Sequence, residues 1–305
     1  MAVMLGVFGS FCFALSAKVQ HSAVGGQVEE NRARQRMDRR QLLQLLQDTH
    51  WWIGMGLMGV SLACQVCGLT MAPVSVVQPV GLLAFPWSVI LAGKLRGPGA
   101  TRILVPTVLT VAAAFGFVAV VAAHTSPSKG LSLIPVAIAS CVVYAVAGLF
   151  ASAGSRGPRQ WRCLFWASGG ALFYGLEASL VKAVIEYARD HAWWQDPMVW
   201  GIGVALVIGS GLAGLLVQQG YATGPTEVVV ASMTVTSPVV AVIFGIAVLG
   251  EGRHLTFGPA FCLVGLGLAA IAGVIMLTRA HPTYRAAKVA ERGDGQEHTE
   301  FLDVG

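Results

Sequence analysis

The sequence is poor in charged residues. Asp, Glu, Lys and Arg make up 11% of its 305 residues, whereas soluble globular proteins carry about 25%. Apolar residues make up 55%, and the 37 glycines follow no Gly-X-Y period. The scarcity of charge excludes an ordinary soluble enzyme, and the apolar content excludes a collagen or a disordered chain. This composition is typical of a protein that lies within a membrane.

Several enzyme motifs are also missing. The sequence contains no G-x-x-x-x-G-K-[ST], no H-E-x-x-H and no G-x-S-x-G, so ATP-driven pumping and the common hydrolase mechanisms lack the residues that carry them. All six cysteines fall inside apolar segments. Cys64 and Cys67 are spaced as C-x-x-C, but within a membrane helix we expect them to fill space rather than bind a metal. We therefore expect no enzymatic activity, no cofactor, and no use of ATP or nucleic acid.

Long apolar runs dominate what the sequence does contain. Blocks of about 20 residues match the length that crosses a hydrocarbon core of roughly 30 Å. Nine such blocks occur, at 2–19, 52–71, 74–93, 103–123, 131–153, 163–185, 199–217, 228–249 and 257–277. The only charged side chains inside them are Lys18, Glu177 and Lys182. The sequence thus predicts an all-α polytopic membrane protein with about nine transmembrane helices.

The basic residues are distributed unevenly between alternate connections. One side of the predicted topology collects fifteen Lys and Arg residues, five of them between the first two blocks, and the other side collects three. Because cytoplasmic loops are enriched in Lys and Arg, we expect the C-terminus in the cytoplasm. With nine crossings the N-terminus lies outside, and the predicted location is the cell (plasma) membrane.

Three segments near the ends of the chain need separate interpretation. The first block could be a cleaved signal peptide, but no basic residue precedes it and cleavage would send the five-arginine loop outward. We expect it to remain as a helix. Within the basic loop 20–50, residues 27–48 fit either an interfacial helix on anionic lipid or a solvated loop. The tail at 279–305 mixes charges without periodicity and is expected to be disordered.

An internal repeat relates the two halves of the sequence. A shift of 152 residues aligns the third block with the eighth without a gap. The identities are Pro73/Pro225, Val76/Val228, Val77/Val229, Pro86/Pro238 and Gly93/Gly245. A shift of 164 residues aligns Lys18 with Lys182. Four-helix repeats at 1–123 and 163–278 would flank a central helix at 131–153, and five crossings between equivalent helices would give them inverted topology, as in many secondary transporters.

Short motifs in both halves carry a family resemblance. They are Ser16-Ala17-Lys18, Trp51-Trp52-Ile53-Gly54, Ala72-Pro73, Val77-Gln78-Pro79-Val80-Gly81, Leu180-Val181-Lys182, Ser237-Pro238 and Leu249-Gly250-Glu251. With these motifs the chain resembles the drug/metabolite transporter (DMT) superfamily, which includes EamA-like proteins, and within it the nine-helix NIPA-type magnesium transporters. The resemblance implies a carrier that binds its substrate between two inverted bundles. The first loop is longer and richer in arginine than in that family, and acidic residues within helices are few for a divalent-cation carrier.

Glu177 is the strongest candidate for a substrate or ion site. It lies about 14 residues into its block, or roughly 20 Å along a helix, near or past the bilayer midplane. An ionisable group at that depth is costly and usually functional. It could bind a cation, exchange a proton or serve as a structural acid. Glu227, which opens the eighth block, either caps that helix through the helix dipole or forms a cation site at the cytoplasmic mouth. Glu177 and Glu227 are thus the two candidate metal ligands.

The other candidates are less specific. Lys18 and Lys182 either extend to the interface or contact substrate. Pro79, Pro86 and Pro238 break helix hydrogen bonds, which frees carbonyl groups for cations or simply kinks the helices. Gln78, directly before Pro79, is the neutral polar side chain that we expect in a cavity.

Three functions fit these residues. The first is a secondary carrier of Mg²⁺ or another cation, working by alternating access. The second is a proton-coupled exporter of small metabolites or drugs. The third is a non-transporting membrane scaffold. The expected partners are the lipid bilayer and a small-molecule or cation substrate, with the protein as a monomer or homodimer.

Overall fold

The computed structural model describes residues 1–29, 39–71, 80–93, 100–124, 133–190, 192–250, 252 and 255–281. All regular structure in these ranges is helical, and eight helices are long and apolar enough to cross a membrane. They are α1 (Ala2–Glu29), α3 (Thr49–Met71), α6 (Ala100–His124), α7 (Leu133–Arg156), α8 (Arg162–Asp190), α9 (Pro197–Thr223), α10 (Thr226–Ala247) and α11 (Phe257–Ala280). The prediction of an all-helical, multi-pass membrane protein is confirmed.

The predicted third span, 74–93, differs from the structure. Its described part is interrupted by a turn at Leu82 and Leu83 before α5 (Ala84–Leu91) begins. Eight residues of helix extend only about 12 Å, which is too short to cross the bilayer. Pro86 lies in the first turn of α5, where its missing N–H group is not needed and where proline favours helix initiation. The described residues therefore contain eight spans rather than nine, and residues 72–79 lie outside them.

Helix α1 is longer than predicted. The first span was expected to end at residue 19, but the helix continues to Glu29, and Gln20, Ala23 and Val24 of the added part are buried. The predicted basic loop thus begins as helix. It also contains α2 (Arg39–Leu45), in which Leu45 is buried while Leu43 is exposed. The sequence of residues 27–48 fits either a helix or a solvated loop, and the structure has a helix in this segment, α2.

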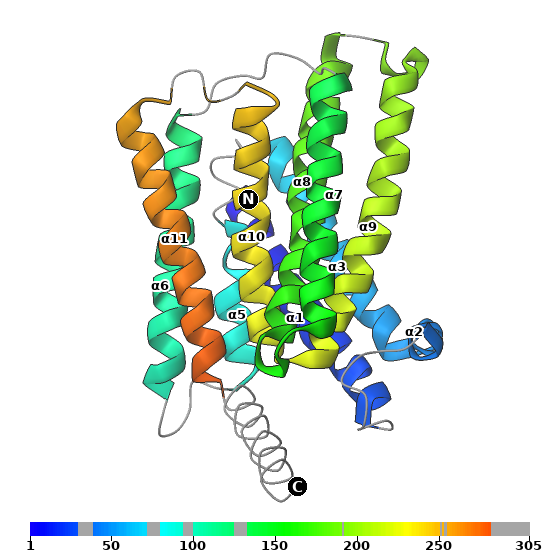
Figure 1. The fold of residues 1–305 in the computed structure, drawn as a ribbon, viewed down its shortest axis with the longest axis vertical. Helices are drawn as coiled ribbons and strands as arrows, with labels where there is room; N and C mark the ends of the chain where they lie inside the picture. Colours follow the sequence, from blue (N-terminus) through cyan, green and yellow to red (C-terminus); the bar gives the residue numbers. More distant parts are fainter. Residues whose placement is uncertain are drawn as a thin grey trace, which may run out of the picture.

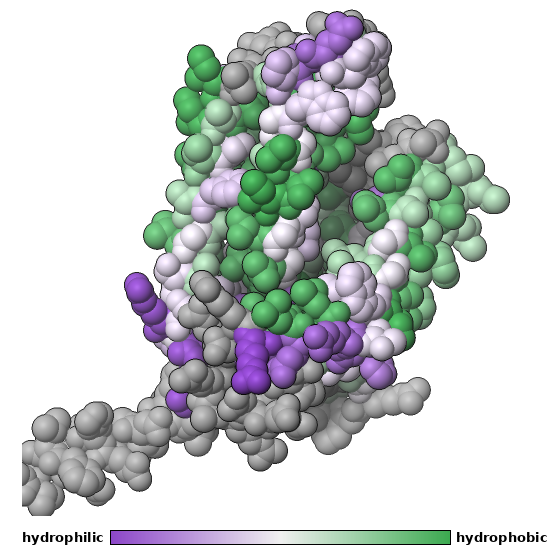
Figure 2. Space-filling model, turned by 90° about the vertical axis from the view of Figure 1, so that its right-hand side faces the viewer, coloured by the Kyte–Doolittle hydropathy of each residue, from purple (hydrophilic) through white to green (hydrophobic). Residues whose placement is uncertain are grey.

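Charge and aromatic residues mark the two ends of the helix bundle. Figure 2 shows hydrophobic side chains over the middle of one face and hydrophilic ones gathered at its ends. We call the end drawn lowest in Figure 1 the basic face. Its described arginines are Arg40, Arg102, Arg156, Arg159, Arg162 and Arg279. The opposite end carries three exposed tryptophans, Trp193, Trp194 and Trp200, of the kind that anchors proteins at a membrane interface.

The start of α9 at that opposite end is held by a capping residue. Asp196 is the N-cap, and its Oδ1 accepts a hydrogen bond of 2.8 Å from the Met198 N–H. Its Oδ2 accepts from the Tyr187 hydroxyl of α8 at 2.6 Å. This hydrogen bond, together with the adjacent carboxylate charge, raises the pKa of the Tyr187 hydroxyl. The connection between α8 and α9 is therefore fixed by both carboxylate oxygens.

The helices pack in pairs. The most extensive contacts join α1 to α3, α8 to α9, α6 to α11 and α8 to α10, and α7 packs mainly on α8. Figure 1 shows α6 and α11 side by side at one edge. Smaller contacts join α1 to α9 and α5 to α10. Helices from the first part of the sequence thus meet helices from the second part at α6–α11, α5–α10 and α1–α9.

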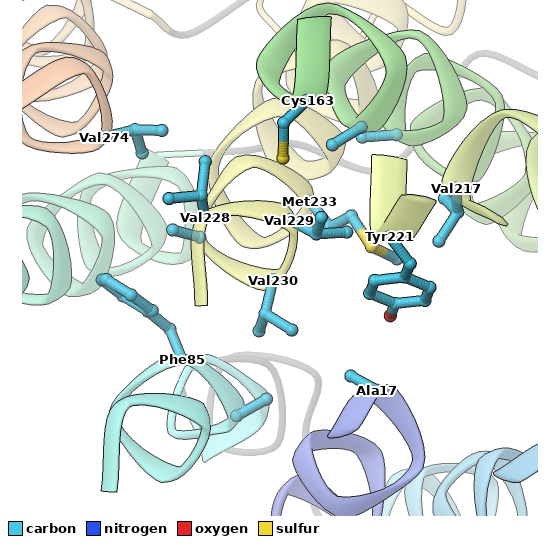
Figure 3. Close-up of a cluster of buried hydrophobic side chains, with 14 of the residues drawn as sticks. Ala17, Phe85, Cys163, Val217, Tyr221, Val228, Val229, Val230, Met233 and Val274 are labelled. Atoms are coloured by element: carbon cyan, nitrogen blue, oxygen red, sulfur yellow. The ribbon is translucent and has the colours of Figure 1, made fainter. Parts of the chain in front are cut away.

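Helix α10 forms the centre of the bundle near the basic face. All residues from 226 to 233 are buried, which is expected of a helix that is apolar on every side and surrounded by others. Figure 3 shows Val228, Val229 and Val230 of this helix pointing to different sides, among Phe85, Tyr221 and Val274 from neighbouring helices. From residue 236 to 243 the same helix is only partly buried or exposed. The bundle is therefore packed most tightly near the basic face.

Candidate functional site

Glu177 lies at the centre of a small cluster formed by α7, α8 and α9. It is half-buried, and its Oε1 accepts a hydrogen bond of 3.0 Å from the Ser210 hydroxyl of α9. Gly209 makes room for it, because a Cβ atom there would lie 3.1 Å from Glu177 Oε1 and 3.4 Å from the Tyr144 hydroxyl. We call Glu177, Ser210 and Tyr144 the Glu177 cluster.

Aromatic rings complete the surroundings of this carboxyl group. The Tyr144 hydroxyl of α7 donates to the Ala205 carbonyl at 3.1 Å, and its ring packs edge-on against Phe173 with centroids 4.8 Å apart. Glu177 follows the first residue of α8 by 15 positions, so it lies roughly 22 Å from the basic face along the helix. The cluster therefore places one carboxyl group, a hydroxyl donor and aromatic rings within the membrane span.

Glu227 occupies a different environment. It lies in the first turn of α10 and is 2% exposed. Its Oε1 is 3.0 Å from Nε2 of His281, which directly follows α11 and is also buried. A carboxylate in this position also interacts favourably with the N-terminus of the helix. The Glu227–His281 pair joins the ends of α10 and α11 at the basic face.

The structure keeps the two glutamates apart. Gly224, just before α10, packs against Cys163 at the start of α8, so both helices begin at the same end. Glu227 is near that end and Glu177 is roughly 22 Å along α8 from it. Within the described ranges, no group of three or more His, Cys, Asp or Glu side chains is placed to hold a metal ion. The two candidate metal ligands, Glu177 and Glu227, therefore lie in separate places in this arrangement.

The two predicted lysines have separate locations. Lys18 donates a hydrogen bond of 2.9 Å from Nζ to the carbonyl of Leu91, the last residue of α5. A cation at this point satisfies a helix C-terminus. Lys182 is exposed on α8, five residues beyond Glu177 and about 140° around the helix from it. The side chain of Glu186, its expected neighbour, lies outside the described residues.

The predicted helix-breaking prolines are described only in part. Gln78 and Pro79 fall outside the described residues. Pro86 begins α5, whereas Pro238 lies inside α10 without ending it. Gly175 of α8 packs on the carbonyl of Ser237 so closely that an added Cβ would lie 2.5 Å from it. The backbone at Pro238 is therefore in tight contact with α8.

A row of buried polar groups connects α3, α1 and α9. The Gln218 amide nitrogen of α9 donates to Gln20 Oε1 of α1 at 2.7 Å. The Gln20 amide nitrogen donates to the Ser16 hydroxyl at 3.0 Å, and Ser16 donates to the Gly54 carbonyl of α3 at 2.7 Å. The next residue of α1, His21, has its Nδ1 atom 3.0 Å from the carbonyl of Tyr221, about one turn beyond Gln218 on α9. We call Gln218, Gln20, Ser16 and Gly54 the amide relay.

Sequence reasoning recognised only part of this relay. On sequence grounds Gln78, rather than Gln218, is placed in a cavity. Gln20 and His21 were placed in a loop because the apolar block ends at residue 19. Ser16 and Gln20 are four residues apart and so share a helix face. This spacing is the sequence signal from which a longer first helix, with Ser16 and Gln20 as hydrogen-bond partners, could have been predicted.

Comparison with known proteins adds little to this geometry. No protein-family model and no solved structure matches the chain. The chain is similar to an uncharacterized protein of Corynebacterium glutamicum, with 28% identity over 215 residues that cover 69% of this chain and 72% of that protein. The relative's name states no activity, so the fold and the polar clusters carry the functional argument.

Proposed function

We propose that this protein is a secondary transporter that exchanges protons for a small organic solute by alternating access. The observation that carries the proposal is Glu177, a carboxyl group in the middle of a membrane span with a serine hydroxyl and tyrosine as neighbours. Such a group is expensive to place in a bilayer and is a functional site by default. It can hold a proton in one state and release it in another. In this proposal Glu177 is the proton-carrying residue.

A non-transporting scaffold has no need for these polar groups. Packing between membrane helices is achieved by small residues and apolar contacts, as at Gly175 and Gly209. The amide relay instead joins α1 to α9 through side chains that can exchange protein partners for water when helices separate. This favours a protein whose two parts move relative to each other.

The helix contacts also support two related halves. If α1, α3, α5 and α6 correspond to α8, α9, α10 and α11, the contact of α1 with α3 matches that of α8 with α9. The contact of α1 with α5 then matches that of α8 with α10, and α6–α11 and α5–α10 each join a helix to its counterpart. This pairing is what a two-fold axis between inverted repeats requires. We include the inverted repeat in the proposal, with the basic face on the cytoplasmic side.

The surroundings of Glu177 favour an organic substrate over Mg²⁺. Divalent cations are usually bound by several carboxylate and carbonyl oxygens, whereas this carboxyl group has one hydroxyl donor and aromatic rings nearby. Aromatic faces suit organic cations. The family resemblance favours Mg²⁺ instead, and the oxygen atoms of Glu177, Ser210 and Tyr144 keep it as the second candidate.

Transport of ethidium, an organic cation, into liposomes tests the proposal. Purified protein is placed in liposomes that contain DNA and an acidic interior, and ethidium is added outside. We expect protons leaving the liposome to drive ethidium inward and increase its fluorescence. In Glu177→Gln this gradient-driven accumulation falls to the level of protein-free liposomes, because the side chain can no longer release a proton. Glu177→Asp, which keeps the carboxyl group, retains part of it.

Two further measurements are needed. The first distinguishes a loss of proton coupling from a loss of folding, and the second tests whether the protein transports Mg²⁺. At equal pH on both sides, Glu177→Gln continues to exchange labelled for unlabelled ethidium, which shows that the protein is folded. Liposomes loaded with a magnesium-sensitive dye report entry of Mg²⁺. If the wild-type protein transports Mg²⁺ but not ethidium, the proposal of an organic substrate is wrong. If it moves neither, transport itself is refuted.

A further inference from the structure

The hydrogen bonds of the amide relay all point in one direction. The Gly54 carbonyl can only accept, so the Ser16 hydroxyl must donate its single proton to it. The Ser16 oxygen therefore accepts from the Gln20 amide nitrogen. This orients the Gln20 amide, whose oxygen accepts from the Gln218 amide nitrogen. The orientation of Gln218 is thus fixed by a backbone carbonyl two helices away.

This orientation leaves an acceptor at the end of the relay. The Gln218 Oε1 atom is buried and has no hydrogen-bond partner among the described residues. The whole side chain is 6% exposed, beside Gln20 at 4% and Ser16 at 2%. An unsatisfied carbonyl in a buried position is unfavourable, and such groups are normally bonded. Turning the amide over would not help, because it would bring two oxygens together at Gln20.

The acceptor lies where helices from the two parts of the sequence meet. Gln218 is on α9 and Gln20 is on α1, and the two helices also meet through His21 and the Tyr221 carbonyl. In Figure 3 the Tyr221 hydroxyl points away from Val229 and Met233, toward the side on which Ala17 of α1 lies. The Gln218 amide and the Tyr221 ring therefore lie together at the contact between α1 and α9.

From these contacts we infer that Gln218 Oε1 is a binding group for an N–H donor of the transported solute. The inference rests on the proposed transport function and narrows its substrate class to small organic cations that carry N–H donors, as ethidium does on its two amino groups. An amide oxygen accepts hydrogen bonds from such a group and repels carboxylates. It offers nothing to a quaternary ammonium ion, which has no N–H. The relay therefore selects for hydrogen-bond donors among organic cations.

Binding of two small cations tests this selectivity. Methylammonium has three N–H donors and tetramethylammonium has none. We expect detergent-purified wild-type protein to bind methylammonium about tenfold more tightly in a calorimetric titration, since a charge-assisted hydrogen bond contributes about 1.5 kcal/mol or more. Gln218→Met, which keeps the length of the side chain and removes the amide, abolishes that difference. Gln219→Met is the matched control, because Gln219 is the adjacent glutamine and equally buried at 6%, and it retains the preference.

A second variant covers the case in which Gln218→Met does not fold. Gln218→Leu also removes the amide and places an apolar side chain among apolar neighbours, so we expect it to abolish the preference for methylammonium as well. The inference is overturned if wild-type protein binds both cations equally or binds neither, since water would then be the natural partner of Oε1. It is also overturned if both Gln218 variants behave as wild type. If the wild-type protein does not transport ethidium but still prefers methylammonium, the proposed function is refuted and the binding role of Gln218 stands.

Discussion

Ser16 satisfies polar groups on two helices at once. Its hydroxyl donates to Gly54 of α3 and accepts from Gln20, while the side chain itself is 2% exposed. Interhelical hydrogen bonds in membranes contribute modestly on average, because the unfolded chain in the bilayer also finds partners. Removing this hydroxyl, however, leaves the buried Gln20 amide with only the Met55 sulfur at 3.8 Å. We therefore assign Ser16 a larger role in stability than an ordinary serine in a membrane helix.

Ser16→Ala should destabilise the protein by about 1–2 kcal/mol, measured as the free energy of unfolding in detergent. Ser10→Ala is the matched control on the same helix. Ser10 is also buried, but its hydroxyl donates only to the Val7 carbonyl of its own helix at 2.7 Å. That carbonyl already takes part in the helix, so we expect a loss of less than about 0.5 kcal/mol. Equal losses in both variants would contradict the relay.

At the scale of whole helices, α6 and α11 are held together by close backbone approach. Gly273 of α11 packs directly on Thr110 of α6, and an added Cβ would also lie 3.0 Å from the Thr110 nitrogen and 3.1 Å from the Pro106 carbonyl oxygen. Backbone atoms cannot rotate away as a side chain can. The approach of these two helices therefore depends on the missing side chain of Gly273, as in other small-residue contacts between membrane helices.

Gly273→Ala should lower the free energy of unfolding by about 1–3 kcal/mol, because the methyl group forces α6 and α11 apart. Gly265→Ala, two turns earlier on the same helix, is the control. No atom lies within 4 Å of its added Cβ, and alanine favours helix by about 1 kcal/mol over glycine, so this variant should be unchanged or slightly more stable. Thermal unfolding of both proteins in the same detergent measures the difference. A Gly273→Ala protein as stable as wild type would show that the two helices can separate at no cost.

The break before α5 shows why one apolar block did not become one continuous helix. The sequence 74–93 is apolar throughout and long enough to cross a membrane, so hydropathy alone predicts a single helix. Proline at residue 86 starts a new helix instead, and Lys18 of α1 caps its end at Leu91. The interruption itself is local, because Pro86 has no N–H to donate to the carbonyl of Leu82. Only the contact of Lys18 with the end of α5 depends on tertiary packing.

The whole molecule is polarised by its basic residues. The fifteen Lys and Arg residues predicted on one side outnumber the three on the other, and the described arginines of that set lie at helix ends on the basic face. Because such residues are usually retained on the cytoplasmic side during insertion, we expect the basic face to lie on the cytoplasmic side. Aromatic side chains at the opposite end, such as Trp194 and Trp200, suit the other interface.

Reporter fusions in a bacterial host test this orientation. Green fluorescent protein fused after residue 305 should fluoresce, because it folds in the cytoplasm. Alkaline phosphatase fused after residue 195, at the opposite end of α8, should be active, because it requires the oxidising outer compartment. The same phosphatase fused after residue 158, at the basic face, should be inactive. The reverse pattern would invert the predicted topology and place the Glu227–His281 pair outside.

The sequence by itself determined the helical membrane fold, because the thermodynamics of the bilayer act on local composition. An apolar run of about 20 residues must form a helix there, since no other conformation within one segment satisfies its backbone. Both ends of five of the eight spans were therefore predicted to within three residues, whereas α1, α8 and α9 extend five to ten residues beyond their predicted ends. Glu177 was identified for the same reason, because a carboxyl group within such a run is unusual wherever the helix packs.

Only the tertiary structure decided which polar groups meet. Glu177 and Glu227 were both candidate metal ligands by sequence. In the packed structure Glu177 accepts a hydrogen bond from Ser210, and Glu227 pairs with His281. Gln20 and Gln218 are 198 residues apart in sequence, yet form one hydrogen bond. Such a pairing depends on how α1 and α9 pack against each other, and a single sequence carries no local signal of it. The position of the unsatisfied Gln218 oxygen, on which the proposed substrate class rests, follows from that packing alone.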